Sequence, residues 1–272
     1  FNGLREIIKK RLNQKSIGFN STVKGKGEEE DYLQYVTPHD FVEFGFEPEF
    51  IGRLPVHVVC QELSVDDLYH ILRHSEGSII RQYERAFRAY GIEVMFSNNG
   101  LRRIAEKAQT QKTGARALMT VCERTLREYK FELPSSSIHE FVVTEQVVDE
   151  PLGELKKLME DANYNRQLVM RERIRRYEAN FYQKYQMGIH FDNEAMELIC
   201  QRAIDQGTTP QDICEKLLQS YEHGLNLVKK NTGQSEFILT KEVVENPDTV
   251  LERWIRESYM TKSKDAGKES AG

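Results

Sequence analysis

The feature that most constrains this sequence is an internal repeat. Four blocks of residues 63–151 recur in the same order in residues 152–255, and their offset varies only between 92 and 96 residues. Because the changes in length fall between the blocks, we interpret the pattern as a tandem duplication of one small domain. The recurring pairs are Ile80 and Ile174, Tyr83 and Tyr177, Phe96 and Phe191, Cys122 and Cys214, Tyr129 and Tyr221, Phe141 and Phe237, and Pro151 and Pro247.

Each copy predicts the same α+β, mostly helical unit. Apolar residues at helical spacing follow Ser64, which forms a predicted capping box with Asp67. Short apolar runs at residues 94–96 and 141–143 predict strands, so the order is helix, strand, helix, helix, strand. Trp254 lies in a terminal helical stripe that we expect to pack on the second copy. Residues 256–272 are polar and predict a disordered tail.

The residues before the repeat predict the end of a larger domain. Residues 1–12 form a short amphipathic helix by their spacing. Residues 56–60 (VHVVC) read as a strand that is buried on both faces. No neighbouring strand is evident nearby, so we expect the rest of its sheet to precede Phe1. A chain that opens on Phe rather than Met is, on the same expectation, a fragment.

Composition excludes some classes of function. The chain has 272 residues, 39% of them hydrophobic and 30% charged, with a net charge of −5. This mild negative charge argues against a dedicated nucleic-acid binder, and no run approaches the ~20 apolar residues of a membrane span. His70 and His74 share a helix face but have no evident third ligand, so we expect no metal site. Four cysteines without a C-x-x-C spacing are expected to be reduced core thiols of a cytoplasmic protein. They are Cys60, Cys122, Cys200 and Cys214.

Two arginines stand in tight, glycine-containing settings. Arg53 follows Gly52, and Arg116 follows Gly114 and Ala115. An arginine is always charged and presents a planar fork of donors, so two of them can bind a phosphate chain from two sides. The alternative is that each pairs with an acidic neighbour. At the equivalent place the second copy reads QGTTP (residues 206–210), without an arginine.

A third candidate is the tripeptide Ile17-Gly18-Phe19, which lies inside a polar stretch. Two large apolar side chains there either fold back onto the core or form an exposed plug that enters a partner's pocket. The local sequence leaves both readings open.

Together these segments resemble the C-terminal half of ClpX-type AAA+ unfoldases. The resemblance rests on the Phe-x-Gly-Leu start, Ile17-Gly18-Phe19, and residues 48–55 (PEFIGRLP) and 112–116 (KTGAR), in the order of that family. It implies that Arg53 is the arginine finger that acts in trans on a neighbouring subunit's ATP site. It also implies that Arg116, with Gly114 and Ala115, is the sensor-2 element of the lid, and that Ile17, Gly18 and Phe19 dock on the ClpP peptidase.

The resemblance further implies a domain plan. Residues 1–62 would be the C-terminal remnant of the AAA+ large subdomain, and residues 63–151 the small, or lid, domain. Residues 152–255 would be a second, degenerate lid-like domain, followed by the tail at 256–272. No G-x-x-x-x-G-K-[ST] phosphate loop is present, so we expect this chain alone to be inactive and to hold no cofactor.

The implied function is that of an ATP-dependent unfoldase subunit. Its cofactor would be ATP with Mg²⁺, and its partners a ClpP-type peptidase, unfolded or tagged substrate proteins, and further copies in a hexameric ring. HslU-type unfoldases share the Gly-Arg-Leu-Pro and Gly-Ala-Arg patterns, but the Ile-Gly-Phe tripeptide argues against them. A non-catalytic interaction or scaffold protein built from lid domains is the alternative from another class.

Overall fold

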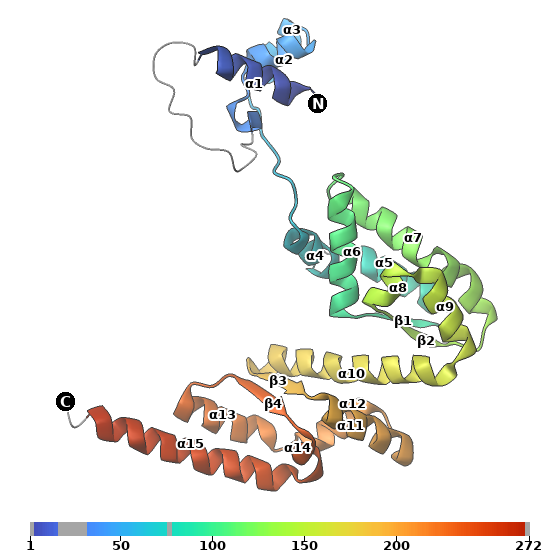
Figure 1. The fold of residues 1–272 in the computed structure, drawn as a ribbon, viewed down its shortest axis with the longest axis vertical. Helices are drawn as coiled ribbons and strands as arrows, with labels where there is room; N and C mark the ends of the chain where they lie inside the picture. The colour runs from blue at the N-terminus through green and yellow to red at the C-terminus, as the bar shows by residue number, and fades with distance from the viewer. Residues whose placement is uncertain (1–2, 16–31, 75–77, 270–272) are drawn as a thin grey trace. The chain divides into compact units, whose positions relative to one another are not determined.

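The computed structural model describes residues 3–15, 32–74 and 78–269 (Figure 1). It confirms the predicted fold class, because most described residues are helical and the strands are short. The chain divides into two compact units, Phe1–Glu62 and Leu63–Gly272. We call the first the N-terminal unit. Within the second, we call residues 63–160 the first subdomain and residues 162–269 the second subdomain.

The N-terminal unit is built from short helices. An ion pair fastens the first of them, because Arg11 Nε lies 2.7 Å from Oδ1 of the fully buried Asp40. Asp40 also accepts a hydrogen bond from the backbone N–H of Thr37 at 2.7 Å, which closes a capping box. Burial opposes the ionisation of Asp40, but the bonds from Arg11 and Thr37 outweigh it and lower its pKa. The helices are α1 (Leu4–Lys15), η1 (Tyr32–Tyr35), α2 (Pro38–Phe44) and α3 (Pro48–Gly52).

The predicted strand at residues 56–60 is wrong. These residues are neither helix nor strand, and the Val56 and Val58 side chains are 76% and 80% exposed. Cys60 is exposed as well, which corrects its reading as a core thiol. A strand satisfies its backbone hydrogen bonds through a neighbour, and the described part of the N-terminal unit contains no other strand. The β-branched residues therefore have nothing to pair with here.

The first subdomain packs its helices around a two-stranded parallel sheet, in which Glu93 lies opposite Glu140. Phe87 and Tyr129 pack against Phe141 of this sheet, with ring centroids 5.2 and 5.3 Å away. The predicted capping box is present, since Ser64 and Asp67 bond each other. The elements are α4 (Val65–His74), α5 (Ile79–Arg88), β1 (Glu93–Phe96), α6 (Asn98–Thr110), α7 (Arg116–Glu132), η2 (Leu133–Ser135), β2 (Glu140–Val143), α8 (Glu145–Asp149) and α9 (Pro151–Glu160).

The second subdomain has the same plan, with one helix broken. Its sheet is also two-stranded and parallel, with Gly188 opposite Glu236. Two helices, α12 (Pro210–Leu217) and α13 (Tyr221–Thr232), stand where the first subdomain has α7 alone. Trp254 stacks on Phe237 with centroids 6.1 Å apart, as its stripe predicts. The elements are α10 (Ala162–Tyr185), β3 (Gly188–Phe191), α11 (Asn193–Gln206), α12 (Pro210–Leu217), α13 (Tyr221–Thr232), β4 (Glu236–Leu239), α14 (Lys241–Glu245) and α15 (Pro247–Glu269).

Repeated residues make the same contact in both subdomains. The hydroxyl of Tyr129 donates to the carbonyl of Pro151 at 3.1 Å, and that of Tyr221 donates to the carbonyl of Pro247 at 2.8 Å. Both tyrosine rings are fully buried. A buried hydroxyl needs a partner, and the backbone carbonyl at the equivalent position supplies it in both copies. This agreement supports the interpretation as a tandem duplication, which stays a prediction.

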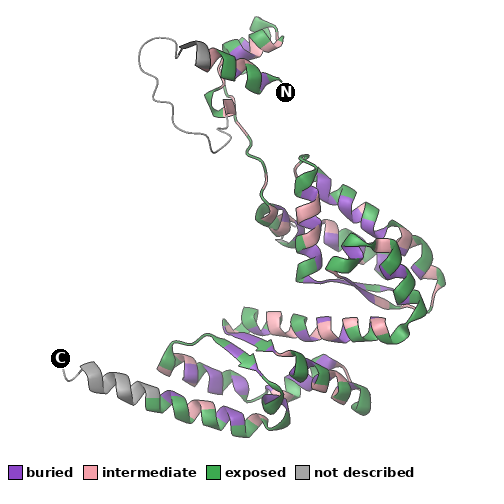
Figure 2. Ribbon diagram, viewed as in Figure 1, coloured by how far each residue is buried: buried purple, intermediate pink, exposed green. Residues whose placement is uncertain are grey.

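One helix, α10, belongs to both subdomains. Val169 in its first half packs with Met95 and Val142 of the first sheet. In its second half, Ile174 and Phe181 lie in the core of the second subdomain. Figure 2 shows buried positions along the length of this helix. A continuous helix therefore replaces a flexible linker between the two subdomains.

Two predicted limits differ from the structure. Leu155 and Leu158 of α9 lie in the core of the first subdomain, so that subdomain continues past residue 151. Helix α15 runs to Glu269, where the sequence predicts a disordered tail from residue 256. Extending a helix that is already packed costs far less than nucleating one, and Trp254 anchors α15 on the second core. Polar composition alone therefore underestimates the helix.

Glu172 is the buried acid of the shared helix. Its residue is 7% exposed, and no described residue forms a hydrogen bond with its side chain. Burial raises the pKa of Glu172 to about 7, against the partial opposing effect of Arg175 and Arg176 and with a contribution from Glu178. The carboxyl group therefore opposes folding wherever it is ionised.

We predict that Glu172→Gln stabilises the protein at alkaline pH. Between the ordinary glutamate pKa of 4.5 and a folded-state pKa of about 7, the unfolded chain loses this proton and the folded chain keeps it. The free energy of unfolding of the parent therefore falls across this interval, and the glutamine variant escapes that fall. Urea unfolding at pH 8 should show the variant more stable by roughly 1–3 kcal/mol, and little difference near pH 4.5. The exposed Glu194→Gln is the control, and parallel pH profiles for Glu172→Gln and parent would contradict the prediction.

Candidate functional site

The turn before α7 has an unusual backbone. Lys112 has φ of 51° and Gly114 has φ of 62°, so the chain enters the left-handed region twice within three residues. Glycine adopts this region without cost, whereas a lysine there is strained by roughly 1 kcal/mol. The turn ends directly at Arg116, the first residue of α7. The positive φ explains why a glycine stands at position 114. The sequence contained no indication that Lys112 would adopt a left-handed conformation.

The N-terminus of α7 is uncapped and carries a cation. The N-cap residue is Ala115, which has no side chain to accept a hydrogen bond, and the first turn contains no acidic residue. Arg116 is exposed, and no described residue pairs with its side chain. A helix N-terminus already has a partial positive charge, so an arginine there is unfavourable for the helix alone. Local rules broken in this way are typical of functional sites.

The equivalent helix start in the second subdomain is closed by a capping box. Gly207 keeps the left-handed turn, with φ of 62°. Thr209 then caps α12, because its Oγ1 accepts from the backbone N–H of Asp212 at 3.2 Å. The carboxylate of Asp212 accepts in return from the backbone N–H of Thr209 at 3.0 Å, and hydrogen bonds from Thr209 lower its pKa. At α7 the N–H groups of Ala117 and Leu118 donate to the carbonyls of Gly114 and Ala115, so no side chain caps the helix start. An anion therefore meets an unpaired cation at α7, but a bound carboxylate at α12.

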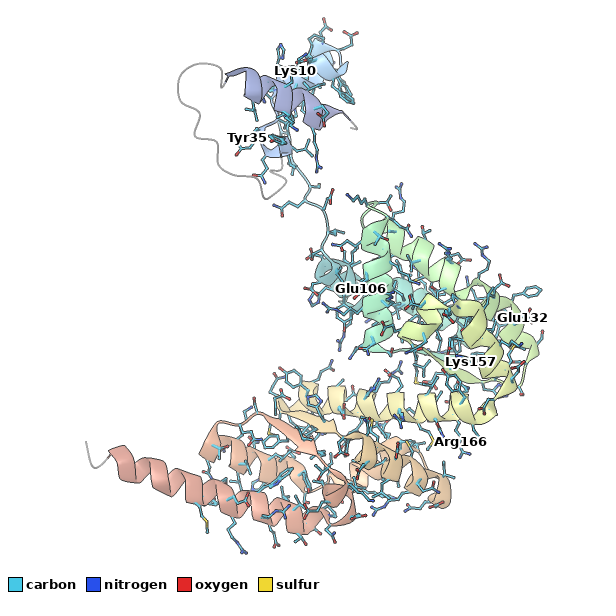
Figure 3. The ribbon with its side chains drawn as sticks, in the orientation of Figure 1. Lys10, Tyr35, Glu106, Glu132, Lys157 and Arg166 are labelled. Carbon is cyan, nitrogen blue, oxygen red and sulfur yellow. The ribbon has the colours of Figure 1, made fainter. Side chains whose placement is uncertain are left out.

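Helix α6, which leads into the turn, is joined to α8 by ion pairs. Asp149, after β2, accepts from Nε of Arg103 at 2.8 Å and lies 2.8 Å from Nζ of Lys107. Arg103 also bonds Glu106 at 2.9 Å, and Figure 3 labels Glu106 on this helix. The bonds to Arg103 and Lys107 lower the pKa of Asp149. This network ties α6 to α8, and the turn that leads to Arg116 starts at the end of α6.

Arg53 lies at the end of α3 in the N-terminal unit. Its backbone N–H donates to the carbonyl of Phe50 at 3.1 Å, while its side chain is exposed and has no partner among the described residues. The side chain of Ile51, on the same helix, is buried, and the ring of Phe50 stacks on that of Phe46 with centroids 6.0 Å apart. The helix thus fixes its backbone and leaves the guanidinium available. Arg53 and Arg116 belong to different units.

A further predicted site is the apolar tripeptide of the N-terminal unit. Ile17, Gly18 and Phe19 lie outside the described residues. Across residues 3–15, 32–74 and 78–269, no three His, Cys, Asp or Glu side chains gather in a way that could hold a metal ion. In the same part of the chain, no helix combines the length and the apolar character that a membrane crossing requires.

Comparison with known proteins matches parts of this chain to a family model and to curated relatives. A family model described as the C-terminal, D2-small domain of the ClpB protein matches residues 63–138. Over 149 residues, the chain is 41% identical to the ATP-dependent Clp protease ATP-binding subunit ClpX of Borrelia duttonii (strain Ly), and equally to that of Borrelia recurrentis (strain A1). Each alignment covers 54% of this chain and 35% of the relative. The chain therefore matches about a third of the length of these relatives.

The family match falls on the first subdomain, from α4 through η2. This is the part that presents Arg116 at an uncapped helix start, on a mostly helical α+β fold. The chain is thus similar to the C-terminal part of ClpX-type AAA+ proteins, and its residues 63–138 match a small-domain family model.

Proposed function

We propose that the first subdomain is the lid of an ATP site and that Arg116 is its phosphate-contacting residue. The observation that carries the proposal is the N-terminus of α7, which has no cap, no acid and an unpaired arginine. Backbone N–H groups and the helix dipole favour an anion at such an end, and a guanidinium binds phosphate oxygens in a fork. Gly114 and Ala115 supply backbone without side chains that would block the approach.

Arg53 is proposed to act on the ATP site of a neighbouring copy. Phosphoryl transfer spreads negative charge over the γ-phosphate oxygens, and an arginine supplied in trans stabilises that charge. An exposed and unpaired guanidinium on a short, rigid helix end suits this role. It would also make hydrolysis depend on assembly into a ring.

The whole protein is proposed to be an ATP-dependent unfoldase subunit with Mg²⁺ and ATP as cofactors. The printed name of the two relatives, an ATP-binding subunit of Clp protease, supports this class. On that proposal the subunits form a hexameric ring, take unfolded or tagged proteins as substrates, and deliver them to a ClpP-type peptidase through Ile17, Gly18 and Phe19. The phosphate loop would be supplied by residues outside this chain.

The second subdomain is proposed to be a lid that no longer senses nucleotide. Its helix α12 begins with a complete capping box where α7 has the arginine. This saturated end favours a role in contact rather than in catalysis. The same observation favours the alternative function, a non-catalytic scaffold built from lid domains.

We predict that Arg116→Ala in the full-length protein lowers ATP turnover about 10-fold or more, because it removes a charged contact to phosphate. Steady-state ATPase assays and thermal unfolding are the measurements. The unfolding midpoint should not fall, because the side chain is exposed and unpaired and its charge is unfavourable at a helix start. Arg124→Ala is the matched control, since it removes another exposed arginine of α7. Equal turnover in both variants and the parent would favour the scaffold.

Arg53→Ala is predicted to abolish ATP turnover at the site of the neighbouring subunit and to leave the variant subunit's own site intact. Mixing this variant with a second variant that lacks the phosphate-loop lysine should restore measurable turnover, because some interfaces then combine an intact loop with an intact Arg53. Lys10→Ala, which changes another exposed cation of the N-terminal unit, is expected to leave turnover unchanged. Failure of complementation in mixed rings would exclude the role in trans.

Phe19→Ala is predicted to weaken binding to the peptidase at least about 10-fold without changing basal ATP turnover, because a large apolar anchor is removed from a plug. Surface-plasmon resonance against the peptidase ring measures the affinity. Ser21→Ala, in the same segment, is the control. Unchanged affinity of Phe19→Ala would leave only the reading in which these residues fold back onto the core.

A further inference from the structure

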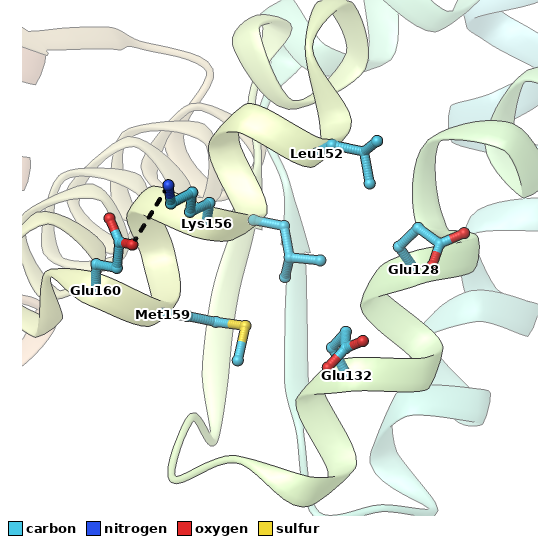
Figure 4. Close-up of a pocket in the computed structure, with 7 residues that line it drawn as sticks. Glu128, Glu132, Leu152, Lys156, Met159 and Glu160 are labelled. Carbon is cyan, nitrogen blue, oxygen red and sulfur yellow. Dashed lines mark ion pairs between the residues drawn. The ribbon is translucent and has the colours of Figure 1, made fainter.

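Helices α7 and α9 leave an apolar groove between them. The groove is a hollow of about 390 Å³ (Figure 4). Leu152 and Met159 of α9 line it and are 66% and 48% exposed, and Leu155 forms its buried floor. These residues are spaced by three and four along α9, so they form one stripe on the same face of the helix. Nothing in the described chain covers that stripe.

The rim of the groove is acidic. Glu128 and Glu132 stand one turn apart on α7, opposite Leu152 and Met159 (Figure 4). No described residue forms an ion pair with either glutamate. On the opposite rim, Lys156 lies 3.7 Å from Glu160, so its charge is already matched within α9. The unmatched charge at the groove is therefore that of two carboxylates.

The groove continues past Met159. The same residue lines a second hollow of about 430 Å³, whose wall includes Asn165 at the start of α10. Asn165 is 9% exposed, and its Nδ2 donates to the carbonyl of Glu140 at 2.7 Å. Its Oδ1 has no hydrogen-bond partner among the described residues. This part of the groove therefore has a polar wall beside the apolar stripe.

We propose that this groove binds a basic segment of a partner protein. One large apolar side chain of the segment enters between Leu152 and Met159, and its Lys or Arg residues pair with Glu128 and Glu132. An apolar stripe with an acidic rim selects this chemistry and repels an acidic segment. One wall of the groove, α9, lies beyond the residues that match the small-domain family. The surface thus goes beyond the proposed nucleotide site and does not depend on it.

The probe for the test is a fluorescein-labelled synthetic peptide built from repeats of Lys-Leu-Leu-Lys. Fluorescence polarisation with the whole 272-residue chain measures its dissociation constant. Two further peptides separate the contributions: one replaces Leu by Ser, the other replaces Lys by Glu. We expect the Lys-Leu peptide to bind at least about 10-fold more tightly than either, because both the apolar anchor and the charges are required.

Two double variants locate the binding. Glu128→Lys with Glu132→Lys should weaken the Lys-Leu peptide about 10-fold or more, and Leu152→Ser with Met159→Ser should weaken it about fivefold. Glu245→Lys with Glu252→Lys makes the same change in net charge on exposed positions of α14 and α15, and should leave the affinity within about twofold of the parent.

Three results would overturn the proposal. The first is a parent-like affinity in the Glu128 and Glu132 variant. The second is an equal loss in the control variant, which would mean attraction to net charge alone. The third is equally tight binding of the serine peptide, which would mean that no apolar anchor is used. Because all the changed side chains lie at the surface, circular dichroism should report an unchanged fold, and the Leu152 and Met159 variant gives an independent second reading.

Discussion

A pair of four-residue strands cannot stand alone in water, and both sheets of this protein depend on the helices packed against them. The strongest expression of this constraint is α10. Its first half covers Met95 and Val142 of the first sheet, and its second half supplies Ile174 and Phe181 to the second core. Neither sheet is fully covered without the same helix. The two subdomains are therefore parts of one compact unit rather than beads on a linker.

The two subdomains keep the same framework but differ in charge at one helix start. Tyr129 and Tyr221 both reach the carbonyl of the proline that follows their sheet. At the left-handed glycine turn, however, one copy continues into an uncapped helix with Arg116, and the other into a capping box of Thr209 and Asp212. A cation at an uncapped start is unfavourable to folding but well suited to a phosphate. This contrast is the basis of the proposed function.

The continuation of the chain past the small domain changes its surface as well. Helix α9 joins the first core through Leu155 and Leu158, and it turns Leu152 and Met159 outward beside Glu128 and Glu132 of α7. Helix α9 thus adds an exposed apolar wall beside the acidic face of α7. The second subdomain and this groove are the parts of the molecule for which the proposed ATP site offers no explanation.

The sequence by itself determined the repeat, the order of helices and short strands, the capping box at Ser64 and the two candidate arginines. All of these follow from local spacing, or from comparing one stretch of the chain with another. Only the tertiary structure decided that residues 56–60 are not a strand, that α15 runs to Glu269 and that α10 is shared. The unpaired state of Arg116 and the groove beside α9 also appear only there. Pairing, burial and the lack of a partner depend on residues far apart in the chain, which no local pattern records.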